Sequence, residues 1–213
     1  MKLYYAPGAC SLAPHIVLEE SGLAYESEAI DLRGNRMTNS GKDFSQINAK
    51  GYVPALVMDD GQLLTEGPAI NQYLADRVPE KKLAPANGSM DRYRLQEWLT
   101  FLGTELHKSF SPLFNPAASE DWKKASLETV ERLLGYVAKE LAGKQYLVGD
   151  NFTIADAYLF TILGWGQYVG LDIGKWPALK EYHGRIFMRP AVQAALKAEG
   201  LIPSAWIERP LGV

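Results

Sequence analysis

Residues 55–65 have the sequence ALVMDDGQLLT, in which two short apolar runs flank Asp59-Asp60-Gly61. A turn that contains glycine between two strand-forming runs is typical of a β-hairpin. Apolar side chains at helical spacing then predict a helix over residues 68–78. This stretch therefore predicts a β-β-α unit.

A second unit is predicted before the hairpin. A strand over residues 3–5 is expected to lead into a helix over residues 11–20, for which Gly22 is a suitable C-cap, and residues 25–31 alternate as a second strand. A strand-helix-strand crossover makes its two strands parallel. The first part of the chain is therefore predicted to be a small α/β domain.

The composition changes near residue 80. There are 6 basic and 11 acidic side chains up to residue 80, against 16 basic and 14 acidic side chains after it. Residues 78–88, VPEKKLAPANG, combine prolines, a glycine and charges, as a connection between domains does. We predict one domain over residues 1–80, a linker over 81–88 and a second domain over 89–213.

Helical periodicity dominates the second part. Two apolar stripes are expected at Leu95, Trp98, Leu99, Leu102, Leu106 and Phe110, and at Leu127, Val130, Leu133, Leu134, Val137 and Leu141. Thr153-Ile154-Ala155-Asp156 has the form of a capping box, and the apolar residues 157–169 after it predict a central helix. Residues 176–187 and 191–196 predict two more helices, so this domain is expected to be all-helical.

Composition excludes several classes of function. The 213 residues carry a net charge of −3, which offers no basic excess for gripping phosphates, so nucleic-acid binding is disfavoured. No apolar run approaches the roughly 20 residues that cross a bilayer, and the N-terminus lacks the apolar core of a signal peptide, so we expect a cytoplasmic protein without a membrane partner. One cysteine and three scattered histidines predict neither a disulfide nor a metal site.

Cys10 is the residue with the clearest chemistry. It lies between a predicted strand and a predicted helix, where helix amides favour a thiolate and lower a thiol pKa. A buried, inert cysteine is the alternative. A dithiol motif would need a second cysteine at residue 13, which is alanine, so exchange chemistry at Cys10 must use an external thiol.

Two other positions are open to more than one interpretation. His107, with Thr100, Thr104 and Ser111 at helical spacing, is either a structural histidine or a group that faces a ligand. Glu66, at the start of the helix over 68–78, either caps that helix or binds a ligand's ammonium group.

Five motifs, in order and at their separations, resemble a bacterial, beta-class cytosolic glutathione transferase over nearly the whole chain. They are the Cys10 loop and residues 51–56, 64–70, 105–108 and 152–156. The resemblance implies an α/β plus all-α fold, with an N-terminal thioredoxin-like domain and an all-helical C-terminal domain. It also implies glutathione as co-substrate, a homodimer and detoxification chemistry.

The resemblance carries roles for particular residues. Cys10 and His107 are the catalytic candidates. The Val53-Pro54 peptide is expected to be cis and to pair with the cysteinyl unit of glutathione, while Glu66 and Gly67 hold its γ-glutamyl end. The full set expected to bind glutathione is Cys10, Asn35, Tyr52, Val53, Pro54, Glu66, Gly67, Thr100, Thr104 and His107.

Asn35 and Thr100 depart from the family pattern. Asn35 stands where relatives often have a lysine for the glycyl carboxylate, so that charge is missing or supplied by Arg36. Thr100 stands where relatives can have asparagine. The electrophile pocket is expected at Phe110 and Trp165, with loops over residues 6–9, 110–116 and 204–207.

Three functions follow from these residues. The first is conjugation of glutathione to small hydrophobic electrophiles. The second is glutathione-dependent thiol-disulfide exchange or dehalogenation through a mixed disulfide on Cys10. The third is non-catalytic carriage of hydrophobic ligands.

Overall fold

The structure is a computed structural model, and it describes residues 1–202. The chain divides into two compact units, the first formed by Met1–Lys81 with the described residues from Phe187 onward, and the second by Lys82–Ile186. The first unit's opening segment thus ends where the predicted linker begins. The last helix differs from the prediction, which placed it in the helical domain: α8 (Pro190–Ala198) packs on α1 (Leu12–Ser21) of the first unit.

A four-stranded mixed sheet organises the first unit. Its strands are β1 (Lys2–Tyr5), β2 (Glu26–Ala29), β3 (Ala55–Val57) and β4 (Leu63–Thr65), in the order β2-β1-β3-β4. β1 pairs parallel with β2 and antiparallel with β3, and β3 pairs antiparallel with β4. The predicted crossover and hairpin are both confirmed.

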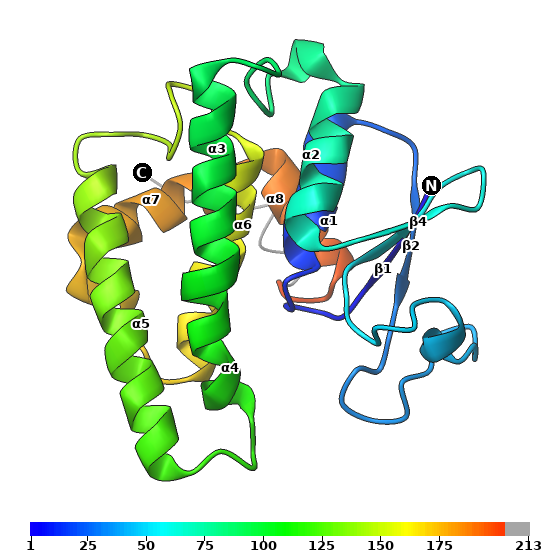
Figure 1. The fold of residues 1–213 in the computed structure, drawn as a ribbon, viewed down its shortest axis with the longest axis horizontal. Helices are drawn as coiled ribbons and strands as arrows, with labels where there is room; N and C mark the ends of the chain where they lie inside the picture. The colour runs from blue at the N-terminus through cyan, green and yellow to red at the C-terminus, as the bar shows by residue number, and fades with distance from the viewer. Residues whose placement is uncertain (203–213) are drawn as a thin grey trace. The chain divides into compact units, whose positions relative to one another are not determined.

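Helices α1 and α2 (Gly67–Arg77) pack together beside this sheet (Figure 1). Gly22 caps α1 as predicted, with a φ of 70° and its amide bonded to the Leu18 carbonyl. Tyr4, Ile30, Phe44, Val53 and Ala55 form a buried apolar cluster in the first unit. The loop from β1 to α1 and the segment before β3 are thereby anchored in a folded core.

The second unit is helical. Its elements are α3 (Met90–Phe101), a π-helical turn (Leu102–His107), α4 (Lys108–Phe114), α5 (Glu120–Leu141), α6 (Ile154–Gly164) and α7 (Pro177–Phe187). Short 3-10 turns occupy Phe44–Gln46 and Pro79–Lys81, and, in the second unit, Trp165–Tyr168 and Ile173–Lys175. The predicted strand-to-helix change of fold class is confirmed.

Helix α6 lies at the centre of the second unit, because every residue from Ile154 to Leu163 is buried. The capping box at Thr153 and Asp156 is present, which confirms that prediction. The helix is shorter than predicted, since it ends at Gly164. In the first stripe Trp98 is only partly buried, and its ring stacks on Tyr136 of α5 with centroids 6.2 Å apart.

Among the described residues, no helix combines the length and the apolar character that crossing a membrane requires.

Candidate active site

Cys10 lies in the turn between β1 and α1, as predicted, and is half-buried. Its thiol donates a hydrogen bond to the Val53 carbonyl, with Sγ and O 3.1 Å apart. The loop before α1 and the segment before β3 therefore meet at the sulfur.

The segment before β3 presents its backbone beside Cys10. The Val53-Pro54 peptide is cis, as the resemblance implied. The Asn48 amide donates to the Tyr52 carbonyl at 2.7 Å, while the Tyr52 side chain is 71% exposed. The hydrogen bond from Asn48 holds the backbone of this segment, while the Tyr52 ring stays exposed to a ligand.

Arg36 reaches this same segment. A Cβ on Gly51 would lie 2.8 Å from Arg36 Nη1, so the guanidinium sits directly against the Gly51 backbone. The Asn35 side chain instead accepts a hydrogen bond from the Met37 amide, within its own loop. Of Asn35 and Arg36, Arg36 is therefore the residue that places a cation against the segment before β3, at Gly51.

Glu66 immediately precedes α2 and has a backbone φ of 69°, which residues other than glycine rarely adopt. Its carboxylate makes no capping bond to α2, so the capping interpretation is wrong. The carboxylate pairs instead with Lys50 Nζ at 2.8 Å, an exposed contact that stabilises the fold little. A Cβ on Gly67 would lie 3.8 Å from Pro54, which puts the start of α2 beside the cis proline.

His107 of the second unit ends the π-helical turn, a feature that often accompanies functional sites. Its Nδ1 is hydrogen-bonded to the Tyr158 hydroxyl at 2.7 Å, and its ring centroid lies 4.7 Å from that of Trp165. Burial, with a smaller effect from Lys108, lowers the pKa of His107 to about 4. The imidazole is therefore neutral near pH 7.

The polar strip predicted beside His107 is present only in part. The hydroxyls of Thr100 and Thr104 are exposed, and each donates to a carbonyl one turn earlier in its helix, at 2.8 and 3.0 Å. The ring of His107 is directed instead toward Tyr158 on α6. The π-helical turn explains this difference, because it breaks the 3.6-residue spacing that the prediction assumed.

Phe110 and Trp165 lie together, with ring centroids 5.5 Å apart, and both are buried. Phe114 extends the cluster at 6.1 Å from Trp165. Residues 108–114 form α4, so the prediction of a loop from residue 110 is wrong for most of its length. Residues 204–207, also predicted to line this pocket, lie outside the described residues.

Comparisons with known proteins match the same two parts of the chain. The family described as "Glutathione S-transferase, N-terminal domain" matches residues 8–77, and "Glutathione S-transferase, C-terminal domain" matches residues 101–190. Glutathione S-transferase GstA of Escherichia coli O157:H7 is 48% identical over 201 residues, which cover 94% of this chain and all of that protein. The chain belongs to the glutathione S-transferase family.

Solved structures refine the class of this transferase. A bacterial beta-class glutathione S-transferase of Sphingomonas chungbukensis is 50% identical with a TM-score of 0.92, and a sphingomonad glutathione S-transferase complexed with glutathione is 53% identical with a TM-score of 0.91. Each alignment covers 95% of this chain and all of the other. The resemblance to the bacterial beta class and the thioredoxin-like fold are confirmed.

The structure of this transferase also contains groups that the sequence interpretation missed. Tyr158 holds His107, and a tyrosine within a fully buried, mostly apolar helix is a usable signal, because a buried hydroxyl needs a partner. Lys50 pairs with Glu66, a contact that no comparable sequence signal indicates. Among the described residues, no cluster of three or more His, Cys, Asp or Glu side chains is arranged to hold a metal ion.

Proposed function

We propose that this transferase conjugates the thiol of glutathione to small hydrophobic electrophiles. The observation that carries the proposal is the 3.1 Å contact between Cys10 Sγ and the Val53 carbonyl, beside a cis proline. A peptide that pairs with the Val53 backbone brings its own cysteinyl sulfur next to Cys10. Cys10 then contacts the sulfur of glutathione.

The ends of glutathione are held by charge and by backbone. Glu66 carries a carboxylate that is 69% exposed and not engaged in capping, so it can exchange Lys50 for the γ-glutamyl ammonium group. The amide of Gly67 is available to the γ-glutamyl carboxylate at the positive end of α2. Arg36 takes the glycyl carboxylate in place of the lysine that relatives often have at residue 35.

His107 acts as a neutral group. With its Nδ1 held by Tyr158, the neutral imidazole polarises or orients the glutathione thiol, whose proton passes to solvent. The sulfur then forms a bond to the electrophilic carbon, and the leaving group departs with its bonding electrons. Phe110 and Trp165 supply aromatic surface for the electrophile, and Thr100 and Thr104 offer exposed hydroxyls to glutathione.

Thiol-disulfide exchange is the second candidate, because Cys10 is not in a disulfide and its side chain is only half-buried. In that reaction the Cys10 thiolate attacks a glutathionyl disulfide, the other thiol leaves, and external glutathione regenerates Cys10. Dehalogenation through the same mixed disulfide uses the same sulfur.

Two assays run side by side separate these functions. Conjugation of 1-chloro-2,4-dinitrobenzene and glutathione-dependent reduction of a glutathionylated disulfide are measured for wild type and Cys10→Ala. Conjugation that exceeds exchange and largely survives the substitution supports the proposal. Exchange that dominates and is lost in Cys10→Ala favours the second candidate, and inactivity in both assays indicates a carrier.

We also propose a cytoplasmic homodimer. A cavity of about 460 Å³ in the second unit is lined by Trp98, Phe101 and Tyr136, with Arg94 and Glu97 among its charged residues. Exposed aromatic surface with both charge signs suits a two-fold contact in which the patch meets its own copy. Sedimentation at micromolar concentration is expected to give twice the 23.6 kDa chain mass, and a species of 23.6 kDa alone would contradict the dimer.

A further inference from the structure

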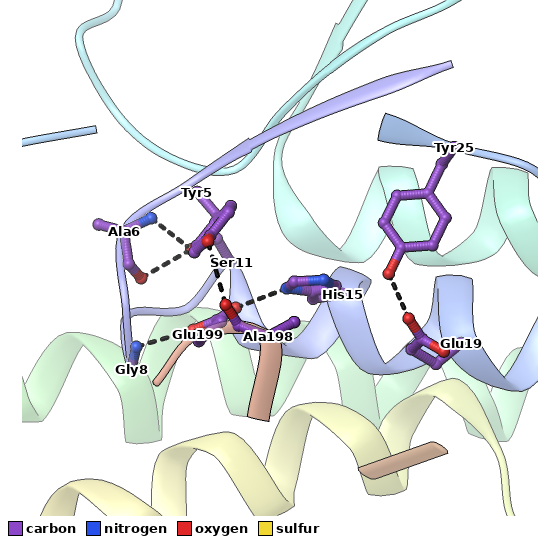
Figure 2. Close-up of polar contacts among 9 residues, drawn as sticks. All are labelled: Tyr5, Ala6, Gly8, Ser11, His15, Glu19, Tyr25, Ala198 and Glu199. Carbon is purple, nitrogen blue, oxygen red and sulfur yellow. Dashed lines mark hydrogen bonds and ion pairs between the residues drawn. The ribbon is translucent and has the colours of Figure 1, made fainter. Parts of the chain in front are cut away.

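The loop that carries Cys10 is closed on itself at its two ends. The Ser11 hydroxyl accepts a hydrogen bond from the Ala6 amide at 3.1 Å and lies 3.2 Å from the Ala6 carbonyl, to which it donates (Figure 2). The Ala9 amide also donates to the Ala6 carbonyl at 3.0 Å. These contacts fix the base of the loop.

The middle of the loop is held from the far end of the chain. The Gly8 amide donates to Glu199 Oε2 at 2.8 Å, across 191 residues of sequence (Figure 2). Glu199 directly follows α8, which packs on α1 within the first unit. A carboxylate from the C-terminal part of the chain therefore anchors the backbone two residues before Cys10.

Glu199 is buried together with His15. Glu199 Oε1 lies 2.8 Å from His15 Nδ1, and both side chains have 0% exposure. His15 Nε2 is buried and has no hydrogen-bond partner among the described residues, so the proton of the ring is best placed on Nδ1, where it is donated to Glu199. Glu199 then receives two donors, one from α1 and one from the Cys10 loop.

The docking of α8 has separate support. Arg189 makes a two-pronged ion pair with Glu20 of α1, at 2.6 and 3.0 Å. The Tyr5 hydroxyl adds a bond to the Ala198 carbonyl at 3.4 Å. Burying a carboxylate is costly, and burial does raise the pKa of Glu199 against the opposing effects of His15 and the Gly8 amide. Because the partly exposed pair of Arg189 and Glu20 already joins α8 to α1, the buried carboxylate of Glu199 is better explained by its contact with the loop than by helix docking.

We propose that Glu199, oriented by His15, is a positioning residue for the Cys10 thiol. Through the Gly8 amide it holds the loop so that Cys10 Sγ stays at the Val53 carbonyl. This inference deepens the proposed function, because it rests on the role given there to Cys10. Loss of the anchor is expected to free the loop, so that Cys10 Sγ leaves the Val53 carbonyl and becomes more accessible to a reagent.

The test measures the rate at which iodoacetamide alkylates Cys10, the single cysteine, near neutral pH in folded protein. Glu199→Ala is expected to react about fivefold faster than wild type, the factor that corresponds to one ordinary hydrogen bond. Glu199→Gln keeps one oxygen for the Gly8 amide, so its alkylation rate is expected to fall between those of wild type and Glu199→Ala. Glu20→Ala is the matched control, since it removes the other acid that joins α1 to α8 without touching the loop.

A purely structural role of Glu199 would leave the alkylation rate of Cys10 unchanged, or change it equally in both alanine variants. With the positioning role, both variants are expected to unfold at lower denaturant concentration, but only Glu199→Ala should change the alkylation rate. Wild-type reactivity in folded Glu199→Ala, or an equal change in Glu20→Ala, would overturn the proposal. If Glu199→Ala does not fold, Glu199→Gln against Glu20→Gln decides, and equal rates overturn it.

Glutathione kinetics separate this inference from the proposed function. With anchor loss, the KM for glutathione is expected to rise about tenfold with kcat nearly unchanged, because the anchor acts on binding and not on the bond-forming step. Alkylation needs no glutathione. If Glu199→Ala is alkylated faster but the wild-type protein conjugates no electrophile, the positioning role stands and only the proposed conjugation is contradicted.

Discussion

Replacement of Asp156 by alanine should destabilise the second unit far more than loss of an ordinary helix cap. Asp156 Oδ2 accepts from the amide and hydroxyl of Thr153 at 2.8 and 3.0 Å, and Oδ1 accepts from the Leu147 amide and the Tyr182 hydroxyl, each at 2.9 Å. The side chain is fully buried. It joins the start of α6 to α7 and to the segment before α6.

The magnitude follows from the donors left behind. The alanine variant leaves two buried amides that cannot turn away, each costing about 1–3 kcal/mol, while the two hydroxyls can rotate. Burial raises the pKa of Asp156, so removing the carboxylate recovers part of that cost. We expect a net loss of about 3 kcal/mol, against about 1 kcal/mol for a typical cap.

The assay is urea unfolding at pH 7, with the free energy of unfolding taken by linear extrapolation at a constant m-value. Asp172→Ala is the matched control, because Asp172 caps the 3-10 turn Ile173–Lys175 from an exposed position through a 2.7 Å bond to the Gly174 amide. It should cost no more than about 1 kcal/mol. Equal losses for the two variants would show that the buried donors around Asp156 add nothing beyond an ordinary cap.

Three further outcomes are expected. Cys10→Ala should abolish the mixed disulfide with glutathione and reduce conjugation less than exchange, and mass spectrometry with steady-state rates checks both; exchange at the wild-type rate would exclude Cys10 as its nucleophile. Burial holds the pKa of His107 at about 4 in the folded protein against about 6.5 unfolded, so stability should be complete above pH 6.5 and fall as the pH drops toward 4. Unfolding curves of His107→Gln should show a shallower loss over that range, and an unchanged slope would contradict the neutral histidine. Trp98→Arg should shift sedimentation toward the monomer, because it places a charge in the proposed dimer patch; an unchanged dimer would exclude that patch as the contact.

Local signals predicted most of the secondary structure. The Asp59-Asp60-Gly61 turn, the Gly22 cap and the Thr153–Asp156 capping box each depend on residues a few positions apart, and each is present. Glu66 is the informative exception. Its position at a helix start predicts capping, but its positive φ directs the side chain away from the helix amides and toward Lys50.

Contacts between distant residues were not predictable in this way. Nothing local to Glu199 indicates that its partner is Gly8, because 191 residues separate them. For the same reason, the sequence predicts α8 within the helical domain, although it packs on α1. The π-helical turn before His107 has no clear sequence signature either, and it redirects the imidazole to Tyr158.

A crystal structure of the protein with bound glutathione would show the site itself. The cysteinyl unit is expected to pair with the Val53 backbone, with its sulfur against Cys10 Sγ and the γ-glutamyl ammonium group on Glu66 in place of Lys50. Glutathione bound elsewhere, or with its sulfur remote from Cys10, would exclude this site.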